Sequence, residues 1–320
     1  MIAFRTLRFI AISSVLAAGL AWHAGFDAPA ADASGQRSTA KSAAAFTARA
    51  DLADRQSRCG VQDLLGAEEE AVERALNASR AADPKGTITV PVYWHIITRT
   101  SPTIEDVSSL VPAQMAVLAT AYASSGFAFE FQGLEVVAND DWFFAEAGSP
   151  EEVEMKASLR QGGPQALNIY TTNGDIYLGW ATFPFNYRFF PSYDGVVLWW
   201  AALPGTGLAG AHPDEPDGIL TYDQGDTGTH EVGHWLGLYH TFQGGCSHPG
   251  DRIKDTPAEA EPQFFCAARD SCLGPVFPGA DPITNFMDYV DDVCMDNFTA
   301  EQTKRMRKQW GAFRNKKAGS

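Results

Sequence analysis

The segment HEVGHWLGLYH, residues 230–240, limits the possible folds of this chain more than any other feature. His230 and His234 are four residues apart, so on an α-helix their imidazoles lie on one face. Both can then reach a single zinc ion at about 2.0–2.1 Å. Gly237 can end the helix in a left-handed conformation, which turns the chain and brings His240 toward the same point.

Three imidazoles leave the fourth position of a tetrahedral zinc ion open, which is typical of a catalytic site. Glu231 lies beside the ligands, where it can hold a metal-bound water but is not placed as a third ligand. HExxH alone is a weak motif, whereas Gly237 and His240 at fixed offsets make the pattern specific.

This segment resembles the extended zinc signature of the metzincin metalloendopeptidases. NFMDY at residues 285–289 is similar to the methionine turn that lies beneath the metal in those enzymes, with Met287 as the methionine. Within the metzincins, residues 240–246, 250–257, 285–292 and 178–184 resemble the pappalysin family. The resemblance covers about residues 85–312. The nearest forms within that family are small, secreted and microbial.

The resemblance implies an α+β fold, in which a twisted, mixed five-stranded sheet and packed helices stand above the zinc cleft. An irregular, disulfide-bonded lower subdomain ending in a C-terminal helix is expected below it. In the implied reaction Glu231 is the general base toward water. Tyr289 matches the tyrosine that donates to the developing oxyanion. A buried Tyr289 whose hydroxyl is satisfied elsewhere is the alternative.

The hydrophobic pattern is consistent with such a fold. It predicts strands over residues 88–97, 127–131, 167–170 and 195–200, and helices over 111–123 and 299–314. Strands and helices alternate before the histidine segment, which indicates a mixed sheet with packed helices. After residue 241 glycine, proline and aspartate are dense and regular patterns are scarce.

The first residues have the pattern of a secretory signal peptide over residues 1–21. Arg5 and Arg8 precede an apolar stretch over residues 9–20, followed by small residues. A membrane anchor is the alternative, but twelve apolar residues are short for a bilayer. We therefore expect secretion, with no stable membrane insertion after signal cleavage. The formal net charge of −15 argues against a nucleic-acid partner.

Residues 22–84 are expected to form a propeptide, and residues 85–320 the catalytic domain. Residues 22–58 have almost no large apolar side chains and cannot build a core, while residues 68–82 have the spacing of a short helix. Cys59 is a thiol that could occupy the open zinc position, as in the cysteine-switch latency of several metzincins. An unpaired or intermolecular thiol is the alternative.

The other four cysteines lie in the second half of the chain and should pair in an oxidising compartment. Sequence alone allows three pairings. The resemblance implies Cys246–Cys272 and Cys266–Cys294. Asn77 and Asn297 stand in glycosylation sequons.

Two weaker signals concern calcium and specificity. Asp251, Asp255 and Thr256 offer oxygen ligands that suit calcium, as in pappalysins; solvated acidic loop residues are the alternative.

Asp291 and Asp292 follow the methionine turn, where a buried carboxylate would prefer Arg or Lys after the cut bond. They could instead be ordinary turn residues.

Together these features predict a secreted, zinc-dependent endopeptidase that acts on proteins or peptides and is made as a latent zymogen. A catalytically silent secreted binding or adhesion domain is the main alternative, and the presence of Glu231 disfavours it. A zinc hydrolase of non-peptide substrates is disfavoured by the metzincin extension of the motif.

Overall fold

The structure is a computed structural model that describes residues 58–81, 84–101, 105–207 and 222–315. The predicted signal peptide and nearly all of the stretch from 22 to 58 lie outside these ranges. Among the described residues, no helix combines the length and the apolar character needed to span a membrane.

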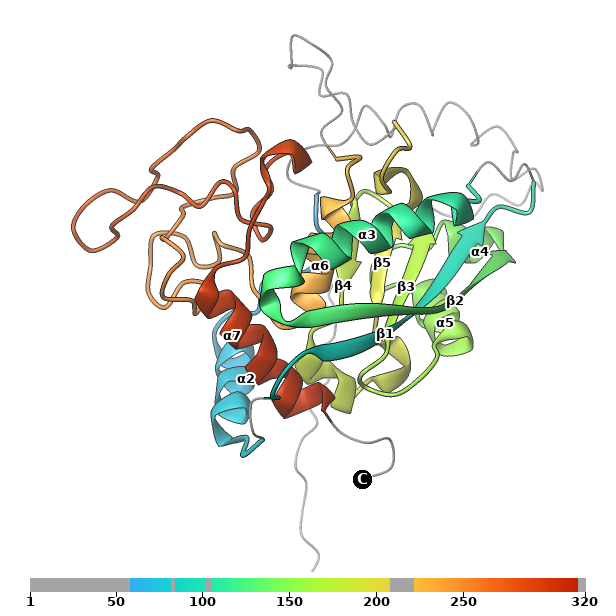
Figure 1. Cartoon of the computed structure of the whole chain (residues 1–320), viewed down its shortest axis with the longest axis horizontal. Coiled ribbons are helices and arrows are strands. Elements are labelled where there is room, and N and C mark those ends of the chain that lie inside the picture. The colour runs from blue at the N-terminus through green and yellow to red at the C-terminus, as the bar shows by residue number, and fades with distance from the viewer. Residues whose placement is uncertain (1–57, 82–83, 102–104, 208–221, 316–320) are drawn as a thin grey trace, which may run out of the picture. The chain divides into compact units, whose positions relative to one another are not determined.

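A five-stranded sheet forms the centre of the described fold, in the order β2-β1-β3-β5-β4 (Figure 1). Four strands run parallel and β4 is antiparallel to β5, so the predicted mixed five-stranded sheet is confirmed. β3 and β5 are buried along their whole length, whereas much of the edge strand β2 is exposed. The strands are β1 Ile88–Thr98, β2 Phe127–Ala138, β3 Leu167–Thr172, β4 Gly179–Ala181 and β5 Val196–Trp199.

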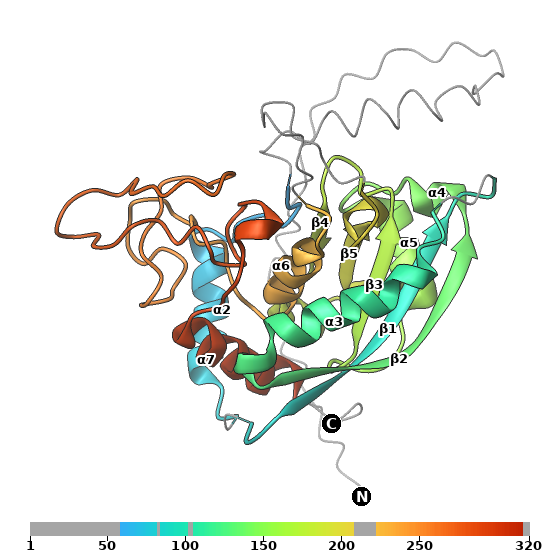
Figure 2. The same cartoon turned by 45° about the horizontal axis from the view of Figure 1, so that its top comes forward.

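Helices α3 and α6 pack side by side on one face of the sheet (Figures 1 and 2). α3 contacts β2, while α6 contacts β4 and β5. The α-helices are α2 Ala67–Ala78, α3 Val111–Ala121, α4 Asp140–Phe143, α5 Pro150–Leu159, α6 Asp226–Trp235 and α7 Ala300–Gln309. Short 3-10 helices η3–η8 span Ser108–Leu110, Ala123–Ser125, Pro184–Arg188, Pro191–Tyr193, Trp200–Ala202 and Asp292–Cys294, and a π-helical turn, η9, spans Trp310–Arg314.

The elements predicted from the pattern are all present, with shifted boundaries. β2 extends seven residues beyond the predicted end at 131, to Ala138. The predicted final helix is divided, because α7 ends at Gln309 and a π-helical turn follows. α7 begins with the capping box of Thr299 and Gln302, in which each side chain accepts a hydrogen bond from the backbone N–H of the other residue. α4, α5 and the short strand β4 were not assigned from the pattern.

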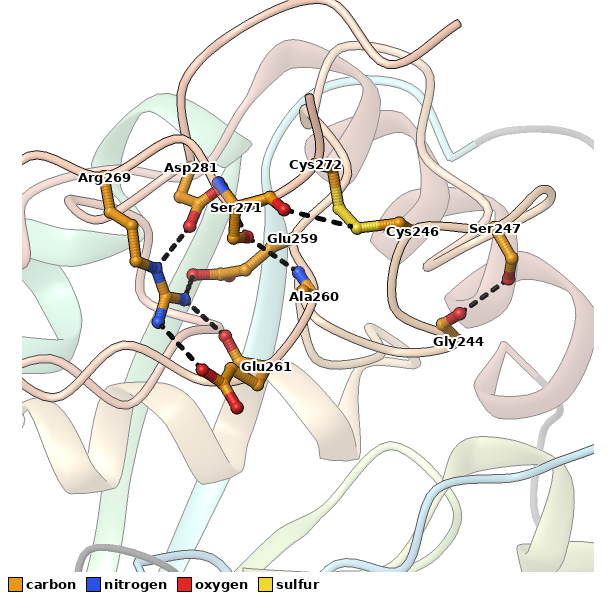
Figure 3. The surroundings of a disulfide bond; sticks show 10 residues. All are labelled: Gly244, Cys246, Ser247, Glu259, Ala260, Glu261, Arg269, Ser271, Cys272 and Asp281. Atoms are coloured by element: carbon orange, nitrogen blue, oxygen red, sulfur yellow. Dashed lines mark hydrogen bonds and ion pairs between the residues drawn. A yellow bond between two sulfur atoms is a disulfide. The ribbon is translucent and has the colours of Figure 1, made fainter. Parts of the chain in front are cut away.

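The region between α6 and α7 contains little regular structure and is held by disulfides and ion pairs. Cys246 pairs with Cys272 and Cys266 pairs with Cys294, as the resemblance implied. Near the first disulfide, the Arg269 guanidinium lies 2.9 Å from a Glu259 carboxylate oxygen and 2.5 Å from an Asp281 oxygen (Figure 3). These disulfides and ion pairs stabilise a region that has few of the regular backbone hydrogen bonds of helices and sheets.

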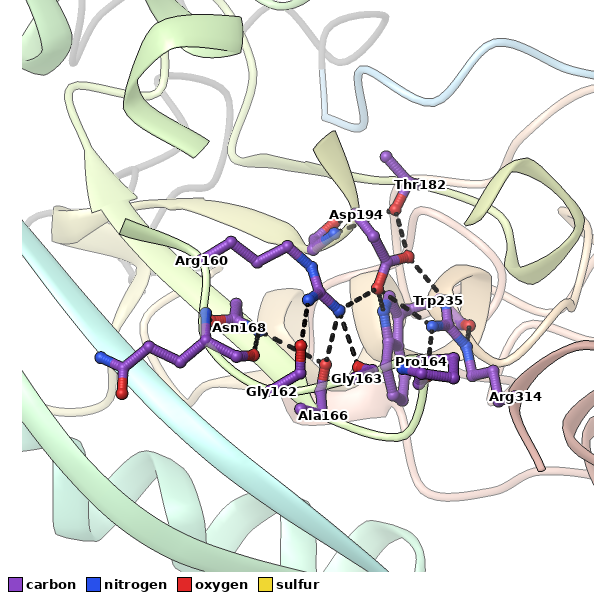
Figure 4. Close-up of polar contacts among 12 residues, drawn as sticks. Arg160, Gly162, Gly163, Pro164, Ala166, Asn168, Thr182, Asp194, Trp235 and Arg314 are labelled. Carbon is purple, nitrogen blue, oxygen red and sulfur yellow. Dashed lines mark hydrogen bonds and ion pairs between the residues drawn. The ribbon is translucent and has the colours of Figure 1, made fainter. Parts of the chain in front are cut away.

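A buried ion-pair network joins η9 to the segment before β5 and to α6 (Figure 4). Arg314 contacts both carboxylate oxygens of Asp194, at 2.9 and 3.0 Å, and donates to the Trp235 carbonyl at 3.0 Å. Arg160 and the Trp235 indole also donate to Asp194. Burial raises the pKa of Asp194, but Arg314 and Arg160 outweigh it, and the pKa lies below its usual value of 3.8.

Replacing Asp194 by alanine should lower the free energy of unfolding by about 3–5 kcal/mol, because it leaves buried guanidinium groups uncompensated. Urea unfolding followed by tryptophan fluorescence measures this. Since the folded-state pKa of Asp194 is depressed, its contribution is complete above pH 3.8 and is lost as the pH falls through the folded pKa. Glu301→Ala, which breaks an exposed pair with Lys304, is the control and should leave the unfolding midpoint unchanged.

Candidate metal centre and active site

Helix α6 carries the first two histidines and is buried from Thr227 to Trp235. Two glycines permit its close packing. A Cβ at Gly228 would lie 2.6 Å from the Gln114 amide nitrogen, and one at Gly233 would lie 2.4 Å from the Met287 sulfur. Met287, the methionine of the predicted methionine turn, is fully buried against this helix face.

The helix start is capped by a distant carboxylate. One oxygen of Asp292 accepts hydrogen bonds from the backbone N–H groups of Gln224, Gly225 and Asp226 at 2.9–3.3 Å. A negative charge at a helix N-terminus also interacts favourably with the helix dipole. Asp292 therefore fixes the beginning of the helix that presents the histidines.

Gly237 ends the helix as predicted, with a φ of 99° in the left-handed region. Leu236 caps the helix, and the chain then turns so that His240 comes back toward His230 and His234. On the outer side of this turn, Arg305 donates to the Gly237 carbonyl at 2.9 Å. The turn thus converts three histidines of one short segment into one cluster.

Gly237→Ala should destabilise the fold by at least about 1–3 kcal/mol through backbone strain. The new Cβ would also lie 2.5 Å from Cγ of Gln309, so His240 should shift and zinc binding should weaken. Urea unfolding and metal analysis of the purified variant measure the two effects. Gly148→Ala is the matched control, because Gly148 has a φ of 79° and nothing within 4 Å of its Cβ position; zinc content that is the same in both variants would contradict the prediction.

The three histidines present a site that fits a metal ion. Each Nδ1 donates to an oxygen: His230 to the Phe286 carbonyl at 2.7 Å, His234 to the Leu238 carbonyl at 2.8 Å, and His240 to Asp63 at 2.8 Å. The Nε2 atoms are then unprotonated, yet that of His234 lies 3.1 Å from each of the other two. Unprotonated nitrogens repel each other, so this convergence calls for a cation.

The spacing agrees with zinc. Tetrahedral bonds of 2.0–2.1 Å place two ligand nitrogens about 3.3 Å apart, close to the distances found. Burial, together with neighbouring histidines, lowers the pKa of both His230 and His234 well below 6.5. Neutral imidazoles are the form that binds metal.

Cys59 and Glu231 lie at the same centre. The Cys59 sulfur and the three histidine nitrogens all lie within 4.8 Å of one another. Burial and the Glu231 charge raise the pKa of Cys59 well above its usual value, and a bound cation would act in the opposite direction. Burial raises the pKa of Glu231 to about 8, although Cys59 and Arg58 lower it.

Gly179 of β4 makes room for Glu231. A Cβ at Gly179 would lie 2.8 Å from Cγ of Glu231 and 2.9 Å from the Val197 carbonyl oxygen. On its backbone side the same residue forms a bridge with Cys59 and accepts from the Gly60 N–H at 2.9 Å. The edge of β4 therefore holds both the candidate base and the cysteine segment.

Tyr289 points into the cluster. Its hydroxyl lies 3.3 Å from Nε2 of His240, and its ring packs edge-on against the His240 ring. Burial and the nearby Cys59 and Glu231 raise its pKa well above 10, so it is a protonated donor.

Comparisons with known proteins agree with this geometry. The family model described as pregnancy-associated plasma protein-A matches residues 219–310. An extracellular metalloprotease of Colletotrichum graminicola is 40% identical over 261 residues, which cover 79% of this chain and 86% of that protein. An extracellular metalloprotease of Neurospora crassa is 38% identical over 250 residues, covering 76% and 81%.

The chain belongs to the pappalysin family. This pappalysin is an extracellular metalloprotease with the metzincin fold, and its three histidines form the zinc-binding site. The prediction of an enzyme is therefore confirmed, and the alternative of a catalytically silent adhesion domain is not.

Solved structures support the same fold. Mature mirolysin of Tannerella forsythia in complex with a cleaved peptide is 26% identical, with a TM-score of 0.55, over 72% of this chain and 97% of that one. A promirolysin mutant of the same organism has a TM-score of 0.62 at 24% identity, over 80% of this chain and 94% of that one.

The acidic residues predicted to bind calcium in this pappalysin make internal hydrogen bonds. Thr256 donates to Asp251 at 2.7 Å, and Asp255 accepts from Thr299 and from the Glu301 N–H at the start of α7. Among the described residues, the only cluster of three or more His, Cys, Asp or Glu ligand atoms is the one around the histidines. Calcium binding at Asp251, Asp255 and Thr256 stays a prediction.

Several residues of the site carried no sequence signal. Arg58 and Asp63 flank Cys59, and the structure brings both into the centre. The pairing of Cys59 with Gly179 joins positions 120 residues apart. Only the cysteine itself marked this segment, because a free thiol was left over from the disulfide count.

Proposed function

We propose that this protein is a zinc-dependent endopeptidase made as a latent zymogen, in which Cys59 occupies the fourth zinc position until the prosegment is removed. The observation that carries the proposal is the convergence of one thiol and three imidazoles within 4.8 Å. Cys59 is the one free cysteine among the described residues and is buried, which disfavours the alternative of an intermolecular disulfide.

In the active form the residues have separate tasks. A zinc ion held by His230, His234 and His240 would supply Lewis acidity toward the scissile carbonyl and toward water. Glu231 accepts a proton from the water and returns it to the leaving amine. Burial raises the pKa of Glu231 in the latent form, and a zinc ion beside it would act in the opposite direction and favour the carboxylate that a base requires. The Tyr289 hydroxyl donates a hydrogen bond to the developing oxyanion. This hydrogen bond stabilises the negative charge of the oxyanion, which would otherwise lack a partner in a buried site.

The prosegment is held by more than its cysteine. The N–H of Leu178 donates to the Arg58 carbonyl at 3.0 Å and Gly60 donates to Gly179, so the segment extends the sheet beside β4. Further along, Arg252 lies 2.7 Å from Glu69 and Arg305 lies 2.6 Å from Glu73 of α2. The predicted helix over 68–82 is thus present as α2, and it docks beside α7 (Figures 1 and 2).

The side chain of Arg58 supports the predicted preference for Arg or Lys after the cut bond. Its guanidinium lies 3.3 Å from Asp292, donates to the Val290 carbonyl and stacks on Tyr222 at 4.4 Å. Both partners of the ion pair are nearly fully buried. A cationic side chain therefore fills this pocket in the latent form, and a substrate Arg or Lys would replace it after activation. Asp291 lies next to the pocket and is also buried.

A library of peptides incubated with the processed enzyme should be cut mainly before Arg or Lys. Asp292→Asn keeps an oxygen for the α6 backbone but removes the charge. It should reduce cleavage before Arg by about 10²-fold, the lower end of the 3–5 kcal/mol expected for a broken buried pair. Mass spectrometry of the products, with and without chelator, measures this. Equal cleavage before Arg and before Leu by the wild type would reject the specificity.

A further inference from the structure

We propose that Asp63 is a positioning residue for the metal centre, so that the prosegment supports the zinc site as well as blocking it. The inference rests on the proposed latent state, in which Cys59 faces the three histidines. It assigns to the prosegment the hydrogen-bond acceptor that orients the third zinc ligand.

The three ligands obtain their orienting partners from different sources. His230 and His234 donate from Nδ1 to the carbonyls of Phe286 and Leu238, which belong to the catalytic domain. His240 instead donates to the Asp63 carboxylate at 2.8 Å. His240 is therefore the one ligand whose partner leaves when the prosegment leaves.

The remaining contacts of His240 do not replace that hydrogen bond. Its ring stacks on Phe242 with centroids 4.7 Å apart and planes 11° apart, and Tyr289 packs edge-on at 5.1 Å. Packing against ring faces fixes the plane of an imidazole but does not choose which nitrogen carries the proton, and the Tyr289 hydroxyl, 3.3 Å from Nε2, offers Nδ1 no acceptor. The acceptor at Nδ1 makes that choice and turns the unprotonated Nε2 toward the metal.

Asp63 is held in place by its neighbours in the chain. The Leu64 carbonyl accepts from the Gln243 side chain at 3.0 Å, three residues beyond His240. Four residues before Asp63, Cys59 is fixed to β4. The Asp63 carboxylate thus lies between two anchored points, with about a third of its side chain exposed. Gln62, directly before it, is exposed.

A carboxylate acceptor makes the opposite nitrogen of an imidazole a stronger metal ligand than a neutral acceptor does. The latent form should consequently retain zinc through two contributions of the prosegment, the Cys59 thiolate and the Asp63 carboxylate. Activation removes both, and water takes the place of the carboxylate at His240. The processed enzyme is then expected to release zinc more readily than the zymogen.

The test uses the full-length protein and measures its dissociation constant for zinc by competition with a chromogenic chelator. Asp63→Ala should weaken zinc binding about 10- to 100-fold, the usual effect of losing an outer hydrogen-bond partner of a ligand. Asp63→Asn retains an acceptor oxygen and should restore most of the affinity. Gln62→Ala is the matched control and should bind as the wild type does. An Asp63→Ala variant that binds zinc within twofold of the wild type overturns the inference.

Cobalt substitution separates this inference from the proposed latent state. A thiolate bound to Co²⁺ gives a charge-transfer absorption band, which should be present in the wild type and in Asp63→Ala but absent in Cys59→Ser. If the wild type lacks the band, the cysteine switch and the inference are both rejected. If the band is present and zinc affinity does not respond to Asp63, the switch stands and the role of Asp63 alone is rejected.

Discussion

Replacing Glu231 by alanine is expected to lower kcat/KM for peptide cleavage by about 10²–10⁴-fold, the usual contribution of a general base. The zinc content should not change, because the ligand nitrogens belong to His230, His234 and His240. Glu231 is fully buried and one of its carboxylate oxygens lacks a hydrogen-bond partner within the described residues. Such an orphaned oxygen next to a metal centre is suited to accept a proton from water.

The measurement compares wild type and variant after removal of the prosegment by the same added protease, since the variant cannot be assumed to process itself. Cleavage of a fluorogenic peptide and metal analysis are recorded on the same samples. Glu301→Ala, at a partly exposed position of α7, should retain full activity. If Glu231→Ala retained turnover with its zinc in place, the base would have to be another group.

The second large effect is expected from Cys59→Ala in the full-length chain. Removing the thiol opens the fourth zinc position, so the unprocessed protein should cleave peptides about 10²-fold faster than the unprocessed wild type. That factor corresponds to a site that is closed in about 99 of 100 wild-type molecules and mostly open in the variant. Arg58 and α2 still hold the prosegment, so activity should remain below that of the processed enzyme.

Initial rates measured within minutes of mixing, together with gel analysis, separate this activity from self-processing. Gln62→Ala, in the same segment, should remain as latent as the wild type. A Cys59→Ala protein with no more activity than the wild type would show that latency depends on the sheet and helix contacts and not on the thiol.

Much of the fold could be predicted because its elements have local patterns. β1 and β5 are runs of β-branched and aromatic residues, and α3 has helical spacing, so each was located to within about two residues at most ends. β2 was the exception, since Gln132 and Gly133 interrupt the alternating pattern after residue 131, where the register of the strand pairing also shifts. Within the part of the chain that the structure describes, the short strand β4 pairs only with β5 and the cysteine segment. Its three residues are too few to show a periodic pattern.

Residues 58–81, the ordered part of the proposed prosegment, are the clearest case where the sequence was insufficient. Only a short helix over residues 68–82 was predicted in this part of the chain, yet residues 58–81 pack against elements that follow them. Their stability comes from partners far along the chain, such as Arg252 for Glu69 and Arg305 for Glu73. Because those partners lie far along the chain, no local pattern in residues 58–81 predicts how the segment packs.

The sequence by itself determined the chemistry of the centre. Helical periodicity places His230 over His234, and one glycine with a positive φ returns His240 to them, so the ligand set follows from bonds and turns within eleven residues. Tertiary structure alone decided which groups surround it. Asp292 caps the start of the metal-binding helix, and Asp194 accepts hydrogen bonds from Arg314 and from Trp235 at the end of that helix. Asp63 accepts the hydrogen bond that orients His240. These contacts join residues 41 to 177 positions apart, and their energy depends on burial and distance, which no local pattern encodes.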